Sequence, residues 1–192
     1  MKIIDISTEA FTAPNYADDP QPKYKWFRNI KDGSEYNLSV MGMTPHTGTH
    51  IDAPLHYFRN GESIDECSLE KCYGSCTVVT ISGVLTGEDM DKLLPFCKKR
   101  LLIHGKGKAS LELSAARVLT ENEMVLVGID SVSISFQEQE EAVHRELLSK
   151  GTLILENINL EGVRDGNYIL CAFPLKLGGL EASPVRAVLI TK

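Results

Sequence analysis

Short apolar runs of strand length alternate with amphipathic segments along most of the chain. β-Branched and apolar residues predict strands at 2–6, 37–43, 76–81, 100–104, 124–129, 152–156, 168–173 and 185–190. Amphipathic periodicity and end signals predict helices at 86–97, 113–122 and 137–150, with Thr86 as an N-cap and Gly151 just past the last helix. Helices interspersed among many strands predict an α/β fold with a mixed sheet. No repeat or linker divides the sequence, so we expect a single domain over residues 1–192.

Residues 11–27 differ from the rest of the chain because they are rich in proline and aromatic residues. The three prolines of this segment exclude a central strand or a long helix. We therefore expect a loop that carries Tyr16 and Trp26. Such a loop is either a packed lid over a site or a surface for a partner, and both interpretations stay open.

The composition changes this picture little but excludes several classes of protein. The 192 residues are 43% hydrophobic and 24% charged, which is typical of globular domains and excludes collagen-like or disordered chains. The net charge of −6 argues against nucleic acid or an anionic membrane as a partner. No apolar run approaches the ~20 residues of a membrane helix, and Asp5 interrupts the start of any secretory signal.

The five cysteines are odd in number and form no Cys-x-x-Cys pair. This pattern is typical of free thiols that act as small core residues in a reducing compartment. We therefore expect the protein in the cytoplasm.

The densest group of metal-ligand residues lies at 45–56, Pro-His-Thr-Gly-Thr-His-Ile-Asp-Ala-Pro-Leu-His. In an extended segment His50 and Asp52 point to the same side, and Gly48 permits a tight turn that swings His46 back toward them. Imidazole and carboxylate ligands together suit zinc and related divalent ions. The alternative is a His-rich polar surface loop, but apolar residues interleave with the ligands. The sequence thus predicts a metal site.

With its neighbouring motifs, this segment resembles the cyclase-like metal-dependent hydrolases, the family of bacterial kynurenine formamidase (arylformamidase). The resemblance covers nearly the whole chain. Its other motifs, in order, are Ile4-Asp5-Ile6-Ser7, Gly128-Ile129-Asp130-Ser131, Leu155-Glu156-Asn157, Phe173-Pro174-Leu175-Lys176 and Ser183-Pro184-Val185-Arg186.

The resemblance implies a site residue by residue. The family's metal ligands fall on His46, His50, Asp52, His144 and Glu156, and its catalytic acid/base falls on His56. The aspartate bridges two ions in binuclear members. From the residues alone, His144 would be interpreted as a core histidine at the edge of an apolar helix face. Glu156 would be a strand-end residue turned to solvent or a buried carboxylate that needs a cation.

Substrate contacts are less defined by the resemblance. Relatives place a stacking tryptophan in the loop after the first strand, and here Tyr16 or Trp26 would take that place, possibly from a neighbouring subunit. Many relatives also carry an Arg-Thr pair where this chain has His104-Gly105. We therefore expect Tyr16, Trp26 and His104 as substrate-binding residues.

The resemblance further implies a swivelling β/β/α architecture and a homodimer or homotetramer. The implied activity is hydrolysis of an amide by metal-activated hydroxide, with N-formylkynurenine as the expected substrate and kynurenine and formate as products. Zinc is the expected ion, as one or two ions per chain, with manganese as the alternative. Two other functions remain open: opening of a cyclic amide or lactone, as in a relative that hydrolyses isatin, and a metal-stabilised small-molecule binding protein without activity.

Overall fold

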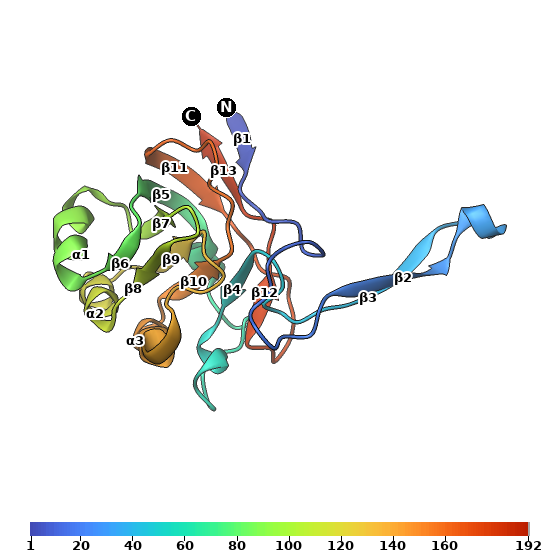
Figure 1. Ribbon diagram of the computed structural model, residues 1–192, viewed down its shortest axis with the longest axis horizontal. Coiled ribbons are helices and arrows are strands. Elements are labelled where there is room, and N and C mark those ends of the chain that lie inside the picture. The colour runs from blue at the N-terminus through green and yellow to red at the C-terminus, as the bar shows by residue number, and fades with distance from the viewer. Residues whose placement is uncertain (192) are drawn as a thin grey trace.

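A nine-stranded sheet forms the centre of the computed structural model, which describes residues 1–191 (Figure 1). Its strands lie in the order β1 (Lys2–Asp5), β13 (Val188–Thr191), β11 (Gly166–Cys171), β5 (Tyr73–Thr80), β7 (Arg100–His104), β9 (Leu126–Ile129), β10 (Leu153–Glu156), β4 (His50–Asp52) and β12 (Ala182–Pro184). The four strands from β5 to β10 run parallel, and antiparallel pairs extend the sheet on both sides. The predicted α/β fold with a mixed sheet is confirmed.

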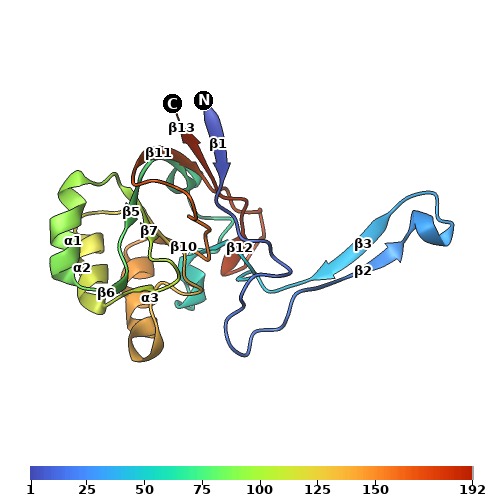
Figure 2. The same ribbon diagram turned by 45° about the horizontal axis from the view of Figure 1, so that its top comes forward.

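Three helices cover one face of the parallel strands: α1 (Gly87–Leu93), α2 (Leu113–Glu121) and α3 (Glu140–Ser149) (Figures 1 and 2). The side chains of alternate residues of β10 point to opposite faces of the sheet. Ile154 packs in the cluster that includes the helices, whereas Leu155 packs in the cluster on the opposite face. Burial on both faces explains why these strands are continuous apolar runs.

The residues predicted to mark the helix ends, Thr86 and Gly151, lie at the start of α1 and just after the end of α3. The Thr86 side chain accepts a hydrogen bond from the amide of Asp89, whose carboxylate in turn accepts one from the Thr86 amide, a capping box at the start of α1. The α-helix ends at Leu93, earlier than predicted, because Pro95 follows and the chain continues as a 3-10 turn. Gly151, with φ +73°, follows the end of α3.

A separate two-stranded ribbon, β2 (Lys23–Arg28) and β3 (Leu38–Gly42), projects from the body (Figures 1 and 2). The prediction of a loop through Phe27 is therefore wrong from Lys23 onward. The last proline of the segment, Pro22, comes just before β2 begins. The alternating sequence Lys-Tyr-Lys-Trp then forms a strand outside the central sheet. The predicted strand at 37–43 exists as β3, but it pairs with β2 in this ribbon and not with the central sheet.

Several elements are too short for the sequence pattern to reveal. They are the parallel pair β6 (Gly83–Leu85) and β8 (Ala109–Leu111), the strands β4 and β12, and 3-10 turns at Ile30–Asp32, Pro54–His56, Leu69–Cys72, Leu94–Phe96 and Gln137–Gln139. All five cysteines are free thiols, as predicted; three of them are buried core residues, whereas Cys97 and Cys171 are partly exposed. Among residues 1–191, no helix has the length and apolar character required to cross a bilayer.

Candidate metal centre

The chain reverses direction at Gly48 before it enters β4. Gly48 has φ +66°, and a Cβ at this position would lie 3.1 Å from the backbone Cα of Ala10, so a side chain would be strained by the backbone conformation and tightly packed. The reversal brings His46 Nδ1 to 3.0 Å from Asp52 Oδ1. His50 and Asp52, as alternate residues of β4, share one face. The turn predicted at Gly48 thus gathers the three residues.

Two other elements bring further ligand-type side chains to the same place. Glu156 lies opposite His50 in the antiparallel β10–β4 pair, and its Oε2 is 3.3 Å from His50 Nε2. His144 extends from α3, with Nε2 3.3 Å from Glu156 Oε1 and 3.8 Å from Asp52 Oδ2. The structure therefore brings all five predicted ligands into one cluster, although they come from three separate segments of the chain.

Backbone carbonyls fix the orientation of two of the histidines. His50 Nδ1 lies 2.8 Å from the carbonyl oxygen of Gly48, and His144 Nδ1 lies 2.8 Å from that of Glu140. A carbonyl only accepts hydrogen bonds, so Nδ1 carries the proton in each ring and donates it. The Nε2 lone pairs of both rings are then free to bind a cation at the centre of the cluster, as is typical of metal-binding histidines.

The cluster buries two carboxylates that have few hydrogen-bond partners. Asp52 is fully buried, and neither of its oxygens has a hydrogen-bond partner in the described chain; His50 Nε2 is likewise unpartnered. Glu156 is 4% exposed and accepts a hydrogen bond from the amide of Ile134 at 2.6 Å. Buried carboxylates are costly unless a cation meets them, and this nitrogen and oxygen donor set suits a divalent metal. The residues present therefore fit such an ion.

The close packing of carboxylates and histidines also shifts the pKa values in the cluster. Burial opposes the charged form of His46 and His144, but the neighbouring carboxylates of Asp52 and Glu156 outweigh it and raise the pKa of each histidine to about 9. Burial also opposes ionisation of Asp52, yet the adjacent His46 keeps the pKa of this carboxyl below its usual range. The site thus attracts positive charge, which a metal ion supplies in place of protons.

His56 lies beside the cluster, at the end of the Pro54–His56 turn, with its ring 4.4 Å from that of His46. Ligand atoms of His46, Asp52 and His56 lie within 4.8 Å of one another, as do those of His50, Asp52 and Glu156. The two groups share Asp52, as two ions bridged by this carboxylate would require. His56 is therefore close enough to be a ligand, and its role as acid/base stays a prediction. Burial lowers its pKa, against the pull of Asp52.

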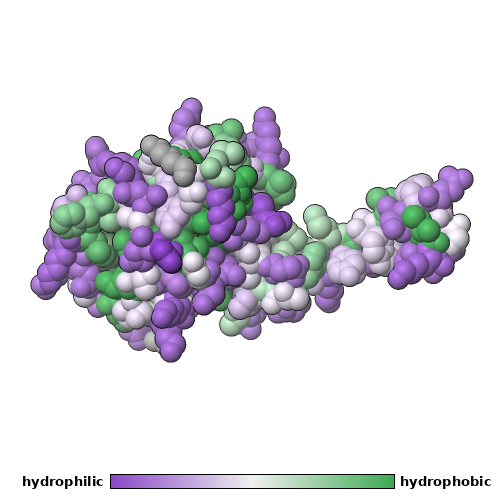
Figure 3. Space-filling view, turned by 90° about the horizontal axis from the view of Figure 1, so that it is seen from above, coloured by the Kyte–Doolittle hydropathy of each residue, from purple (hydrophilic) through white to green (hydrophobic). Residues whose placement is uncertain are grey.

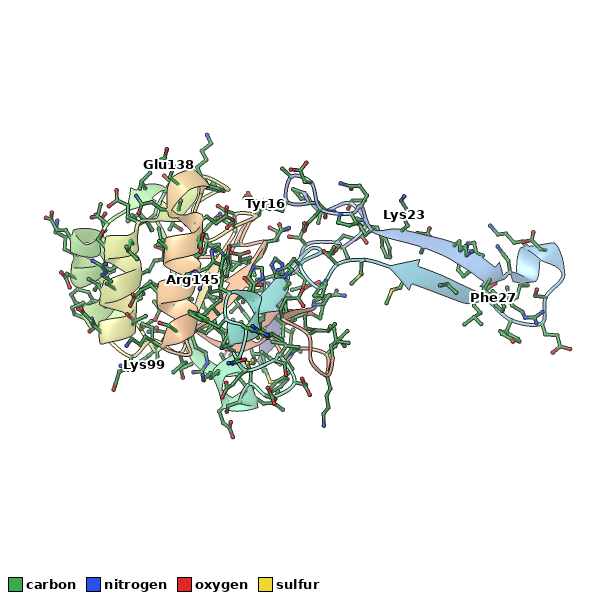
Figure 4. The ribbon with its side chains drawn as sticks, turned by 90° about the horizontal axis from the view of Figure 1, so that it is seen from below. Tyr16, Lys23, Phe27, Lys99, Glu138 and Arg145 are labelled. Atoms are coloured by element: carbon green, nitrogen blue, oxygen red, sulfur yellow. The ribbon has the colours of Figure 1, made fainter. Side chains whose placement is uncertain are left out.

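A pocket opens over the cluster, and Tyr16, Tyr57, Ser133 and Glu140 form part of its wall. The Tyr16 hydroxyl donates to Glu140 Oε2 at 2.5 Å, and Ser133 donates to Glu140 Oε1 at 2.8 Å. The first of these bonds raises the pKa of Tyr16 to about 12. Figure 4 shows Tyr16 between α3 and the projecting ribbon. Glu140 thus ties this loop to the helix that carries His144.

Of these wall residues, sequence reasoning identified Tyr16 and missed the others. The spacing of Glu140 and His144, one helical turn apart, is a signal that a search around the ligands would have found. Glu181 was also missed; its Oε1 lies 3.4 Å from His46 Nε2.

Comparisons with known proteins agree with this site. A family model described as "Putative cyclase" matches residues 4–100. The kynurenine formamidase of Delftia acidovorans is 33% identical over 202 residues, which cover 98% of this chain and 97% of the relative. The chain belongs to the putative cyclase family.

Solved structures of the putative cyclase fold superpose on nearly the whole chain. A predicted metal-dependent hydrolase from Bacillus stearothermophilus is 30% identical with a TM-score of 0.84, covering 98% of this chain and 97% of its own. Isatin hydrolase A from Labrenzia aggregata, bound to benzyl benzoate, has a TM-score of 0.83 and covers 100% of this chain and 94% of its own. At 20% identity the isatin hydrolase shows a shared fold alone.

Two predicted substrate residues of this cyclase-family chain lie elsewhere. Trp26 is 51% exposed on the ribbon, where its ring lies 6.3 Å from that of Tyr24. His104 ends β7 and lines a separate cavity with Asp130 and Asn157. Because β9 lies between β7 and β10, two strand spacings of about 4.8 Å each separate His104 from the cluster. Neither residue lines the pocket of its own chain.

Proposed function

We propose that this chain hydrolyses aryl formamides, converting N-formylkynurenine to kynurenine and formate. The observation that carries the proposal is the buried cluster of histidines and carboxylates with unpartnered Asp52 oxygens, which opens into a pocket walled by two tyrosines. Similarity to kynurenine formamidase over nearly the full length supports the reaction and its substrate class. A relative described as a metal-dependent hydrolase supports the dependence on a metal.

We propose that His46, His50, Asp52, His144 and Glu156 hold one or two divalent ions, zinc as the expected ion and manganese as the alternative. When bound, such an ion polarises a carbonyl oxygen and makes water acidic near neutral pH. Asp52 and Glu156 neutralise the added charge. Their negative charge also explains why a cation is retained in a site that is almost closed to solvent.

His56 is the residue that moves protons in this proposal. Its lowered pKa leaves the imidazole neutral at rest, so it first takes a proton from the attacking water. The same proton then passes to the nitrogen of the leaving amine as the carbon–nitrogen bond breaks, which releases the amine and formate. A binding protein without activity has no need of a histidine at this place.

The tyrosines account for the preference for an aryl group. A formyl group is small, so most of the binding energy must come from the aromatic part of the substrate, which packs against an aromatic wall. Tyr16 and Tyr57 provide this wall in one chain. We further propose a cytoplasmic homodimer or homotetramer, in which Trp26 reaches a pocket only from another copy.

The test compares kcat/KM on three substrates after metal analysis of protein purified without chelators. We expect N-formylkynurenine to be cleaved faster than an aliphatic formamide and faster than isatin. Faster opening of isatin would replace the formamidase proposal with the cyclic-amide alternative. No turnover of any of the three by metal-replete protein would contradict an enzymatic role and favour a metal-stabilised binding protein.

A further inference from the structure

The pocket over the metal cluster has an acidic wall that the proposed hydrolysis does not use. Its lining residues include Asp19 and Glu140 in addition to the ligand Glu156, and in the described chain no lysine or arginine lines it. Asp52 and Glu156 share their charge with a metal ion when one is bound, whereas Asp19 and Glu140 have no such compensation. These last two carboxylates are here called the acidic wall.

The acidic wall is assembled from two separate segments of the chain. Glu140 is the first residue of α3, whereas Asp19 lies in the loop that leads into the projecting ribbon (Figure 3). Figure 4 places Tyr16 between α3 and this ribbon. The hydrogen bond to Glu140 is the main cause of the raised pKa of Tyr16, about 12, and the charge of Asp19 contributes to the same shift. The two carboxylates therefore act on the same part of the pocket.

Glu140 has room for a further hydrogen-bond donor. Its Oε1 accepts from Ser133 at 2.8 Å and its Oε2 accepts from Tyr16 at 2.5 Å. An ionised carboxylate offers about four lone-pair sites, so about two remain. The ion pairs that lysine and arginine form in the described chain use carboxylates other than Asp19 and Glu140. The acidic wall is therefore open to a donor from outside the chain.

Arg145 lies beside the pocket without lining it. Its guanidinium carbon is 5.7 Å from the centre of the Tyr57 ring. Its Nε donates to Glu141 at 2.7 Å, and its Nη1 donates to the carbonyl oxygen of Tyr57 at 2.9 Å. These hydrogen bonds go to groups of the chain itself, so a negatively charged substrate group meets no lysine or arginine among the described lining residues.

This chemistry matches a cationic amine. An ammonium group has three donors and no acceptor, so it pairs with carboxylate oxygens through short, charge-assisted hydrogen bonds. Asp19 and Glu140 are half-buried, which reduces screening of their charge by salt. The rings of Tyr16 and Tyr57, which line the same pocket, attract a cation further. A substrate carboxylate in this place would instead be repelled.

We propose that Asp19 and Glu140 form a subsite for an ammonium group on the side chain of an aryl formamide. The inference rests on the proposed formamidase activity and narrows it, because N-formylkynurenine carries both an ammonium and a carboxylate on its side chain. The acidic wall recognises the first group and disfavours the second. The best substrate is then an aryl formamide that carries the amine and lacks the carboxylate.

Three aryl formamides separate the two charges. All are ortho-formamidophenyl ketones, and their side chains are aminoethyl, carboxyethyl or ethyl, so they carry a positive charge, a negative charge or none. We compare kcat/KM for each compound with metal-replete wild type, Asp19→Asn and Glu140→Gln. Asp18→Asn is the matched control, because Asp18 is an exposed aspartate next to Asp19 that is not among the lining residues.

We expect the wild type to cleave the aminoethyl compound about 10–100-fold better than the ethyl compound, the gain that a hydrogen bond to a charged group supplies. The carboxyethyl compound should be the poorest of the three. The ratio of kcat/KM for the aminoethyl and ethyl compounds should fall toward one in Asp19→Asn and Glu140→Gln, and should keep its wild-type value in Asp18→Asn. A variant that merely disturbs α3 or the Tyr16 loop would lose activity on both compounds alike, so this ratio separates recognition from structure.

A wild-type ratio at or below one, or a preference for the carboxyethyl compound, would overturn the inference. So would a wild-type ratio that persists in both Asp19→Asn and Glu140→Gln. Failure of the proposed hydrolysis is a separate outcome, in which none of the three compounds is cleaved. Binding of the intact compounds, measured by isothermal titration calorimetry, then decides: tighter binding of the aminoethyl compound supports the subsite, and equal binding or none overturns it.

Discussion

Two histidine–carboxylate groups lie in neighbouring parts of the central sheet, one at the ends of β7 and β9 and the other on β4 and β10, and they differ in how the carboxylate is satisfied. Asp130 lies 3.7 Å from His104 Nε2 and accepts hydrogen bonds from the amides of Gly105 and Lys106 at 2.9 and 2.8 Å. Asp52, beside His46 and His50, accepts none in the described part of the chain. Both aspartates are therefore near a histidine, but only Asp52 lacks hydrogen-bond partners within residues 1–191.

The difference shows which feature marks a cation site. A histidine next to an aspartate is common to both places, so proximity alone does not distinguish them. The Gly105–Gly107 turn wraps its amides around Asp130 and stabilises the charge, which is a structural role. At Asp52 no backbone amide of the described chain compensates the charge, so the compensation comes from protonated histidines or from a cation that replaces their protons. Unsatisfied buried carboxylates, rather than the count of histidines, identify the metal centre.

The largest expected effect is that of Asp52→Asn. Asn keeps the shape of Asp but removes the charge shared by both groups of ligands, so metal content and hydrolysis of N-formylkynurenine should fall to background. Metal analysis by mass spectrometry and a turnover assay measure the two effects. An Asp52→Asn protein that retains the wild-type metal content would contradict the distinction between Asp52 as a metal ligand and Asp130 as a structural residue.

His56→Ala tests the division of roles within the cluster. If His56 is the acid/base, turnover should fall by about 10²–10⁴ while metal content and fold stay the same. The loss concerns kcat, because the residue acts on the proton in transit rather than on binding. Loss of metal from this variant would instead identify His56 as a ligand, an outcome that its distance from His46 and Asp52 makes geometrically accessible.

The metal-free protein should lose stability as the pH rises. His46 and His144 have a pKa of about 9 in the folded chain against an ordinary value of 6.5, so their stabilisation is complete below about pH 6.5 and is lost as the pH passes 9. The loss is on the order of 1.4 kcal/mol per pKa unit.

Metal-loaded protein should behave in the opposite way, because deprotonated histidines bind a cation more tightly. Thermal unfolding with chelator and with added metal, between pH 6 and pH 10, checks both directions. If the unfolding temperature depended on pH in the same way with and without metal, the assignment of these histidines as metal ligands would be contradicted.

The smallest effect is expected from Asp130→Asn, the matched change at the other aspartate. Loss of a charged acceptor for backbone amides should lower the free energy of unfolding by about 1–3 kcal/mol. Metal content, kcat and KM should remain those of the wild type. Urea unfolding and the same metal analysis provide the comparison, and a loss of metal here would assign the second group a ligand role as well.

Much of this organisation could be predicted from the sequence, because local patterns carry it. The apolar runs of the parallel strands, the cap at Thr86 and the turn at Gly48 are all encoded within a few residues. His144 and Glu156 became candidates only through the family resemblance, since their convergence with His50 depends on the β10–β4 register and on the packing of α3.

Other features escaped prediction for physical reasons. β4 has three residues, too few for any periodicity to appear. The role of Glu140 depends on a contact with Tyr16, which is 124 residues away in the sequence, as well as on Ser133 in the segment before the helix. The strand Lys23–Arg28 escapes prediction because the prolines that precede it outweigh the alternation of lysine and aromatic residues within it.

Titration of divalent metal into chelator-stripped protein, with N-formylkynurenine hydrolysis measured at each step, tests the central claim most directly. The account predicts no turnover without metal, and activity that rises to a plateau at one or two equivalents per chain. The Asp130→Asn protein should follow the same curve, whereas Asp52→Asn should stay at background throughout. Full turnover by stripped wild-type protein, or an Asp52→Asn curve that matches the wild type, would contradict the claim that this cluster is a catalytic metal centre.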